Sequence, residues 1–229
     1  MKTEMGDTQL EDVAARRTAR RVLVVTAVIS TVCGVLYFLG LAGKWAVDGT
    51  IHSASSPSIQ MVSAAMGLLW DATLVAMFVA LRRQLARRHA VWAELGVAFM
   101  ALLCATSSIN WFVQLTLVPQ VARAGDAALL ALVDVRGESS IMYAIEHLAW
   151  GLFYGLATIF MALAIEGGKL ERWIRWLFLV GGALSIVHVL GIVMASGPLT
   201  DLGYFAAGVL LPVTTALLAL RFRAKAVSG

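Results

Sequence analysis

The sequence predicts an all-α integral membrane protein, a bundle of six transmembrane helices with both termini in the cytoplasm. Three observations support this fold class. Of the 229 residues, 60% are apolar and only 14% carry charge, which excludes a soluble globular domain and a disordered chain. The apolar residues form six long runs, each about the 20 residues that a helix needs to cross a bilayer. The basic residues are concentrated in alternate connections between these runs.

The six apolar runs define the expected helices. They cover residues 22–43, 59–81, 91–118, 141–165, 176–196 and 203–220. Only three residues that can carry a full charge at neutral pH fall within them, namely Asp71, Glu94 and Glu146. Lipid offers no partner to backbone N–H and C=O groups, and the runs lack the alternation of barrel strands. Helices are therefore the expected spanning elements.

The distribution of Lys and Arg predicts the orientation. Of the 18 Lys and Arg residues, 15 lie in the two terminal segments and the second and fourth connections; only Lys44, Arg123 and Arg136 lie in the others. By the positive-inside rule both termini are cytoplasmic and the protein is a multi-pass protein of the cell membrane. The expected organisation is a cytoplasmic segment 1–21, a transmembrane domain 22–220 and a cytoplasmic tail 221–229.

The same basic residues indicate which partners to expect. They face the anionic inner leaflet of the bilayer, which is the expected partner. They are scattered over short connections with no folded basic domain, so the sequence does not indicate nucleic-acid binding. An oligomer is compatible with the sequence, which does not specify one.

Three local patterns refine the expected helices. Thr8 and Glu11 form a capping-box pattern that predicts the start of a short cytoplasmic helix. Within the long outer connection 119–140, residues 126–135 read as a short helix able to cover the outer end of the bundle. Pro212 lies inside the sixth run and should kink it, because proline has no N–H for the helix ladder.

Polar side chains inside the apolar runs are the candidate ligand-binding residues. They are Asp71, Asn110, Gln114, Glu146, His147 and His188. Thr106, Asn110 and Gln114 recur every four residues and should share one helix face. At 1.5 Å per residue, the six candidates lie in the outer half of the bilayer or at its floor. Because such residues face the bundle interior or water, we expect one outward-facing polar cluster that binds or translocates a small solute, ion or proton.

Glu94 is set apart from this cluster. It lies sixteen residues before Asn110, near the inner end of the third run and on another face of that helix. Its side chain should reach the interface and pair with Arg87 or Arg88.

Other functions use the same residues. The main alternative is a structural or interaction protein, because intramembrane Asn, Gln and His often only hold helices together. A second alternative is a haem protein in which His147 and His188 ligate one iron; no other cofactor and no metal site is expected. The sequence contains no zinc-hydrolase motif, serine-hydrolase motif or glycine-rich phosphate loop, so an enzyme is not the preferred interpretation.

Two segments resemble a known group of proteins. INWFVQLTLVP at 109–119 and LERWIRWLFLVGG at 170–182 are similar to segments of an uncharacterised family of bacterial polytopic membrane proteins, known only as a domain of unknown function. In that family the fourth helix carries a glutamate near its start, a position that Glu146 matches. The resemblance implies a small bacterial inner-membrane protein and no assigned activity.

Overall fold

The computed structural model is all-helical and describes residues 2–48, 57–137 and 139–227. Among these residues there is no strand. The elements, in chain order, are α1 (Lys2–Asp48), α2 (Pro57–Arg82), η1 (Arg87–His89), α3 (Ala90–Ala124), α4 (Ala127–Val133), α5 (Ile141–His147), η2 (Leu148–Phe153), α6 (Tyr154–Ala164), α7 (Lys169–Val193), α8 (Gly197–Phe205), η3 (Ala206–Leu210) and α9 (Leu211–Val227). η1 is a 3₁₀ turn, whereas η2 and η3 are π turns.

Six helical stretches are long and apolar enough to cross a membrane. They are Val13–Gly40, Gln60–Arg82, Arg87–Ala124, Ile141–Ala164, Lys169–Val193 and Gly197–Arg223. Each overlaps one predicted run, so the all-α fold with six spanning stretches is confirmed. The fourth stretch joins α5, η2 and α6, and the sixth joins α8, η3 and most of α9.

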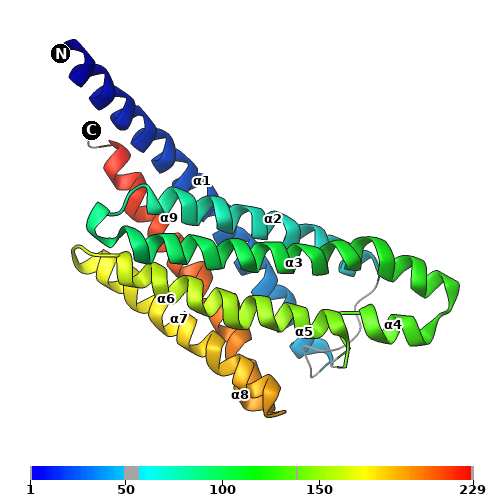
Figure 1. Ribbon diagram of the computed structural model, residues 1–229. Coiled ribbons are helices and arrows are strands. Elements are labelled where there is room, and N and C mark those ends of the chain that lie inside the picture. Colours follow the sequence, from blue (N-terminus) through cyan, green and yellow to red (C-terminus); the bar gives the residue numbers. More distant parts are fainter. Residues whose placement is uncertain (1, 49–56, 138, 228–229) are drawn as a thin grey trace.

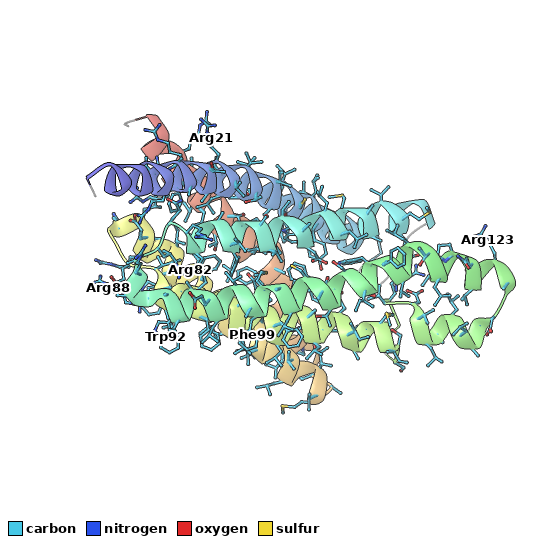
Figure 2. All side chains as sticks on the ribbon, turned by 45° about the horizontal axis from the view of Figure 1, so that its top comes forward. Arg21, Arg82, Arg88, Trp92, Phe99 and Arg123 are labelled. Atoms are coloured by element: carbon cyan, nitrogen blue, oxygen red, sulfur yellow. The ribbon has the colours of Figure 1, made fainter. Side chains whose placement is uncertain are left out.

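The helices follow one another around a closed bundle. α1 packs against α2 and α9, α2 against α3, α3 against α6, α6 against α7, and α7 against α8 and α9. The start of α1 and the end of α9 lie at the same end of the bundle (Figure 1). Figure 2 shows Arg82, Arg88 and Trp92 near one end, whereas Arg123 lies at the opposite end. This separation agrees with the alternation of basic connections in the sequence.

Glu94 forms an ion pair that differs from the predicted one. Its Oε1 lies 2.8 Å from the guanidinium of Arg82, and not beside Arg87 or Arg88. The prediction was wrong because it relied on nearness in the sequence, where Arg87 and Arg88 are closer to Glu94 than Arg82 is. Glu94 is on the second turn of α3, beside the last turn of the antiparallel helix α2, where Arg82 lies. Arg88 pairs instead with Glu166 in the connection between α6 and α7.

Two further ion pairs tie the basic end together. His89 Nε2 lies 2.7 Å from Glu166 Oε1, which joins the α2–α3 connection to the α6–α7 connection. Arg221, in α9, pairs with Glu171 on the first turn of α7. The exposed pairs contribute little each, because water screens them; their positions nevertheless show that these connections meet at one end.

Several helices extend beyond the runs that predicted them. α1 is helical from Lys2, so the Thr8 and Glu11 pattern does not begin it. α3 continues past Pro119 and ends at Gly125, whose φ of 73° is the left-handed conformation that glycine adopts readily. α7 begins at Lys169, seven residues before the predicted run. An apolar run indicates only the part of a helix that lies within lipid. The backbone hydrogen bonds of the helix can continue beyond that part into water.

The connection after α3 contains the predicted short helix. α4 begins after Asp126, whose Oδ1 accepts a hydrogen bond from the backbone N–H of Leu129 at 2.9 Å. α4 packs back along α3 and also contacts α5, forming a helical hairpin at the end opposite the termini (Figure 1).

A π turn replaces a simple kink near Pro212. η3 covers the five residues before α9, and Pro212 is the second residue of α9. The wider turn adapts the backbone to the missing N–H of proline. The hydroxyl of Thr214 donates to the carbonyl oxygen of Leu210 at 2.7 Å, and that of Thr215 to Pro212 at 3.0 Å.

α6 and α7 approach most closely at two glycines. A Cβ added to Gly182 would lie 2.7 Å from the carbonyl oxygen of Gly155 and 2.6 Å from the hydroxyl of Thr158. By contrast, a Cβ at Gly40 of α1 would meet no atom within 4 Å. Backbone-to-backbone contact at Gly182 therefore leaves no space for a side chain.

We expect Gly182→Ala to destabilise the bundle by about 1–3 kcal/mol through overpacking and to lower its thermal unfolding midpoint in detergent. Gly40→Ala is the matched control, and should leave the midpoint unchanged or slightly higher, since alanine favours a helix by roughly 0.5–1 kcal/mol. Equal midpoints for the two variants would contradict the close packing of α6 against α7.

Candidate functional site

Four stretches of helix position the six predicted site residues. Asp71 is in α2, Asn110 and Gln114 are in α3, Glu146 and His147 end α5, and His188 is in α7. Glu146 is half-buried and the other five are buried, with Asp71 and Asn110 fully inaccessible. All six therefore lie inside the bundle, as ionisable residues in lipid-spanning helices require.

A chain of amide hydrogen bonds leads from Glu146 to the outer connection. The Nδ2 of Asn110 donates to Glu146 Oε2 at 2.7 Å. The Nε2 of Gln114 donates to Asn110 Oδ1 at 3.3 Å and to the carbonyl oxygen of Val133 at 2.8 Å. Gln60 of α2 donates to Gln114 Oε1 at 3.3 Å. These bonds join α2, α3, α4 and α5 at one place.

Asp71 lies on the other side of Glu146 and is incompletely hydrogen-bonded. The hydroxyl of Ser108 donates to its Oδ2 at 3.3 Å, and Ser107 is also within hydrogen-bonding reach. Its Oδ1 has no hydrogen-bond partner among the described residues. Glu146 is close enough to interact electrostatically with this carboxyl group. The two acids therefore belong to one site.

The predicted candidates did not include two residues that belong to the cluster, Ser107 and Trp150. The Nε1–H of Trp150 donates to Ser107 Oγ at 3.2 Å, and both side chains are within reach of Glu146. Ser107 precedes Asn110 by three residues, so helical spacing could have found it. Thr106 is not in the cluster, because its hydroxyl bonds to the backbone carbonyl of Leu102.

His147 and His188 form a direct imidazole pair. Nδ1 of His147 lies 2.7 Å from Nε2 of His188, and Nδ1 of His188 bonds to the carbonyl oxygen of Thr200 in α8. A carbonyl only accepts, so His188 carries its proton on Nδ1. Neutral His188 then accepts at Nε2, and His147 must donate from Nδ1. The basic lone pair of the histidine pair is consequently on Nε2 of His147.

This contact does not fit the haem alternative. Metal–imidazole bonds are about 2 Å long, so two axial ligands of one iron would hold their nitrogens about 4 Å apart. The facing nitrogens of His147 and His188 are 2.7 Å apart. Within the described residues, no group of three or more His, Cys, Asp or Glu side chains could hold a metal ion.

Aromatic rings enclose both parts of the cluster. The Tyr143 ring meets that of His147 edge-on, with centroids 3.9 Å apart. Tyr204 lies beside both histidines, with centroid distances of 6.4 Å and 6.0 Å, and is close enough to interact electrostatically with Glu146. Tyr204 thus lies beside the histidine pair and near Glu146.

The outer connection lies over Gln114 and contains a local ion pair. The carboxyl group of Asp134 binds Arg136 through its side chain and backbone, with Nε–Oδ1 at 2.8 Å, and the N–H of Val135 donates to Gln114 Oε1 at 3.4 Å. Burial raises the pKa of Asp134, but the hydrogen bonds and charge of Arg136 outweigh that effect. The pKa of Asp134 therefore lies below its ordinary value.

No protein-family model, curated protein or solved structure matched this chain. The resemblance of residues 109–119 and 170–182 to an uncharacterised membrane family thus stays a prediction from those segments. The functional argument depends on the geometry of the cluster.

The tautomers of the histidine pair can be tested by NMR of ¹⁵N-histidine-labelled protein. When neutral, His147 and His188 should both carry their proton on Nδ1, whereas free imidazole side chains favour Nε2. His147→Gln and His188→Gln assign the two signals. An Nε2–H signal from wild-type His147 would contradict the hydrogen-bond assignment.

The Asp134 ion pair predicts a loss of stability in acid. Because the folded pKa is depressed, its stabilisation is complete above the ordinary aspartate pKa of about 4 and is lost as pH falls through the lower folded value. The unfolding midpoint of the wild type should approach that of Asp134→Asn as pH is lowered from 6 toward about 3. A difference between the two proteins that does not change with pH would contradict this contribution.

Proposed function

We propose that this chain is a multi-pass membrane protein that binds and translocates protons through the acid–histidine cluster. Of the small solutes, ions and protons that the sequence suggests, the proton fits the geometry best. The observation that carries the proposal is the buried Oδ1 of Asp71, which has no hydrogen-bond partner among the described residues and lies in a site shared with Glu146. A proton on this oxygen needs no cavity of its own, whereas a solute or a larger ion would need one.

The charges of the two acids support this choice. Neither Asp71 nor Glu146 belongs to any ion pair of the described residues, whose pairs lie at the helix ends or in the connections. Two neighbouring carboxylates in a low-dielectric bundle repel each other strongly. Binding of a proton relieves that repulsion, and its release restores it. Such a pair is suited to hold a proton temporarily.

The histidine pair supplies a second proton-binding group. One proton added to Nε2 of His147 leaves both hydrogen bonds of the pair intact. A second proton would place two N–H groups face to face 2.7 Å apart, so the pair holds one. Because the carbonyl of Thr200 cannot relay a proton, exchange with the histidine pair runs through Nε2 of His147.

Buried hydroxyl groups extend from Asp71 toward the basic end. Thr73, two residues along α2, lies 3.2 Å from Ser30 Oγ of α1. Thr26 lies one turn further along α1 toward its start and is also buried. Thr26 donates to carbonyl oxygens of its own helix, so the Thr73–Ser30 contact is the polar link that supports passage from α2 to α1 on the inner side of Asp71.

The proposed topology places the cluster toward the outside. The basic connections meet at one end of the bundle, and by the positive-inside rule that end and both termini are cytoplasmic. The protein would then reside in the cell membrane, as the resemblance to a bacterial inner-membrane family also implies, with its arginines at the anionic leaflet.

A structural role is the second candidate. The bonds from Asn110 to Glu146 and from Gln114 to Val133 connect three elements, and intramembrane hydrogen bonds of this kind stabilise helix association by about 0.6 kcal/mol on average. That role explains the amide residues but leaves the unpartnered oxygen of Asp71 without a use.

Proton flux into proteoliposomes, driven by a potassium diffusion potential and read by an internal pH dye, tests the proposal. Flux should exceed that of protein-free vesicles for the wild type and fall to background in Asp71→Asn and Glu146→Gln. Glu94→Gln removes an exposed carboxylate that pairs with Arg82 and should retain the flux.

Two results would overturn proton translocation: no flux from the wild type, or unchanged flux in both cluster variants. A lowered unfolding midpoint in Asp71→Asn and Glu146→Gln, together with a wild type that carries no flux, would favour the structural role.

A further inference from the structure

The first two turns of α7 carry a surface patch that the proton path does not use. It consists of Arg172, Trp173, Arg175 and Trp176, which we call the RW patch. Both tryptophans are more than half exposed, at 58% and 57%, and both arginines are exposed. Large apolar rings flanked by free basic groups at one level of a spanning helix are the composition of a headgroup interface.

The orientation of α7 places the whole patch on one outward face. Ile174, between the two Arg–Trp pairs, is buried at 1% exposure, and so is Phe178 one turn later. Phe178 meets Phe78 of α2 edge-on at 5.8 Å. Side chains three and four residues apart lie on the same face of a helix, so Arg172 neighbours both Arg175 and Trp176, and Trp173 neighbours Trp176.

The acids that the structure describes at this end pair with other basic residues. Glu171 is next to Arg172 in sequence, but its carboxylate pairs with Arg221 of α9. Glu94 pairs with Arg82, and Glu166 with Arg88 and His89. Arg172 and Arg175 are in none of the ion pairs found within residues 57–137 and 139–227.

We infer that the RW patch is a binding site for the headgroup of an anionic phospholipid. The planar guanidinium groups of Arg172 and Arg175 match phosphate oxygens and can bind them in a bidentate manner. The rings of Trp173 and Trp176 sit at headgroup depth beside the first acyl carbons, because indole has an apolar face and one N–H donor. The site lies apart from the proton path and does not depend on it.

A third exposed tryptophan lies at the basic end of the bundle, on another helix. Trp92, in the first turn of α3, is 41% exposed and stacks on Phe160 of α6 with centroids 5.9 Å apart. Trp92 lies at the basic end of the bundle in Figure 2. It has no arginine arrangement like that of α7, so the RW patch is the more selective of the two.

The test compares lipids on the full-length protein. Delipidated protein in detergent receives phosphatidylglycerol or phosphatidylcholine with identical acyl chains, and its thermal unfolding midpoint is measured. Phosphatidylglycerol should raise the midpoint by several degrees more than phosphatidylcholine does. In Arg172→Gln/Arg175→Gln that difference should largely disappear. The control Arg83→Gln/Arg87→Gln removes the same charge from exposed positions at the same end and should retain it.

An equal lipid difference in the RW variant and the wild type would overturn the site. So would an equal loss in the control, because diffuse basic charge would then explain the binding. If the RW variant does not fold, tryptophan quenching by brominated lipid decides. Brominated phosphatidylglycerol should quench the wild type more than brominated phosphatidylcholine does, and Trp173→Phe/Trp176→Phe should lose this difference. Equal quenching by both lipids in the wild type would overturn the proposal.

Discussion

A polar group inside a hydrocarbon layer cannot exchange its partner for water, and this constraint governs the bundle from backbone to site. Helices satisfy the backbone internally. Isolated hydroxyls bond back to their own helix, as Thr31 does to the carbonyl of Ala27 at 2.8 Å and Thr158 to that of Tyr154 at 2.9 Å. Side chains with more donors and acceptors must find partners on other helices. The few polar residues of the spans are consequently brought together in the interior.

Most groups in the cluster satisfy one another, which makes the exceptions informative. The amide nitrogen of Asn110 donates to Glu146, and its amide oxygen accepts from Gln114. Gln114 also donates to the carbonyl oxygen of Val133. In the histidine pair His147 donates to His188, and His188 donates to the backbone carbonyl of Thr200, so the donor and acceptor of each hydrogen bond are defined. The Oδ1 of Asp71 is a buried acceptor without a donor among the described residues, and a buried polar group of that kind costs about 1–3 kcal/mol. Such a cost is retained where the group serves a purpose other than packing.

The number of apolar helices and the inward position of the six polar residues could be predicted because each depends on a property of single residues. Apolar length predicts a crossing, and a polar residue within such a run must face inward. Which side chains meet could not be predicted. Glu146 and His147 are adjacent in sequence yet contact α3 and α7 respectively, and Glu94 pairs across to α2. Serine is common in spanning helices, so only the three-residue spacing from Asn110 could have singled out Ser107.

The ends of the helices were also beyond the reach of hydropathy. Pro119 and Lys169 lie inside helices although both are outside the predicted runs. A proline near a helix end removes one hydrogen bond, and water can satisfy the carbonyl that loses it. Lys169 lies in the first turn of its helix, where the charge stays solvated.

The π turn η2, which starts directly after His147, has a mechanical consequence. A π turn contains one surplus residue, and each residue of an α-helix accounts for about 100° of rotation. If the surplus shifted along the chain toward Ile141, the residues it passed would turn by that angle while the ladder of backbone bonds stayed closed. Glu146 and His147 would then both turn away from the neighbours that they face now. A shift of the π turn would thus reorient the acid and the imidazole together without unwinding the fourth span.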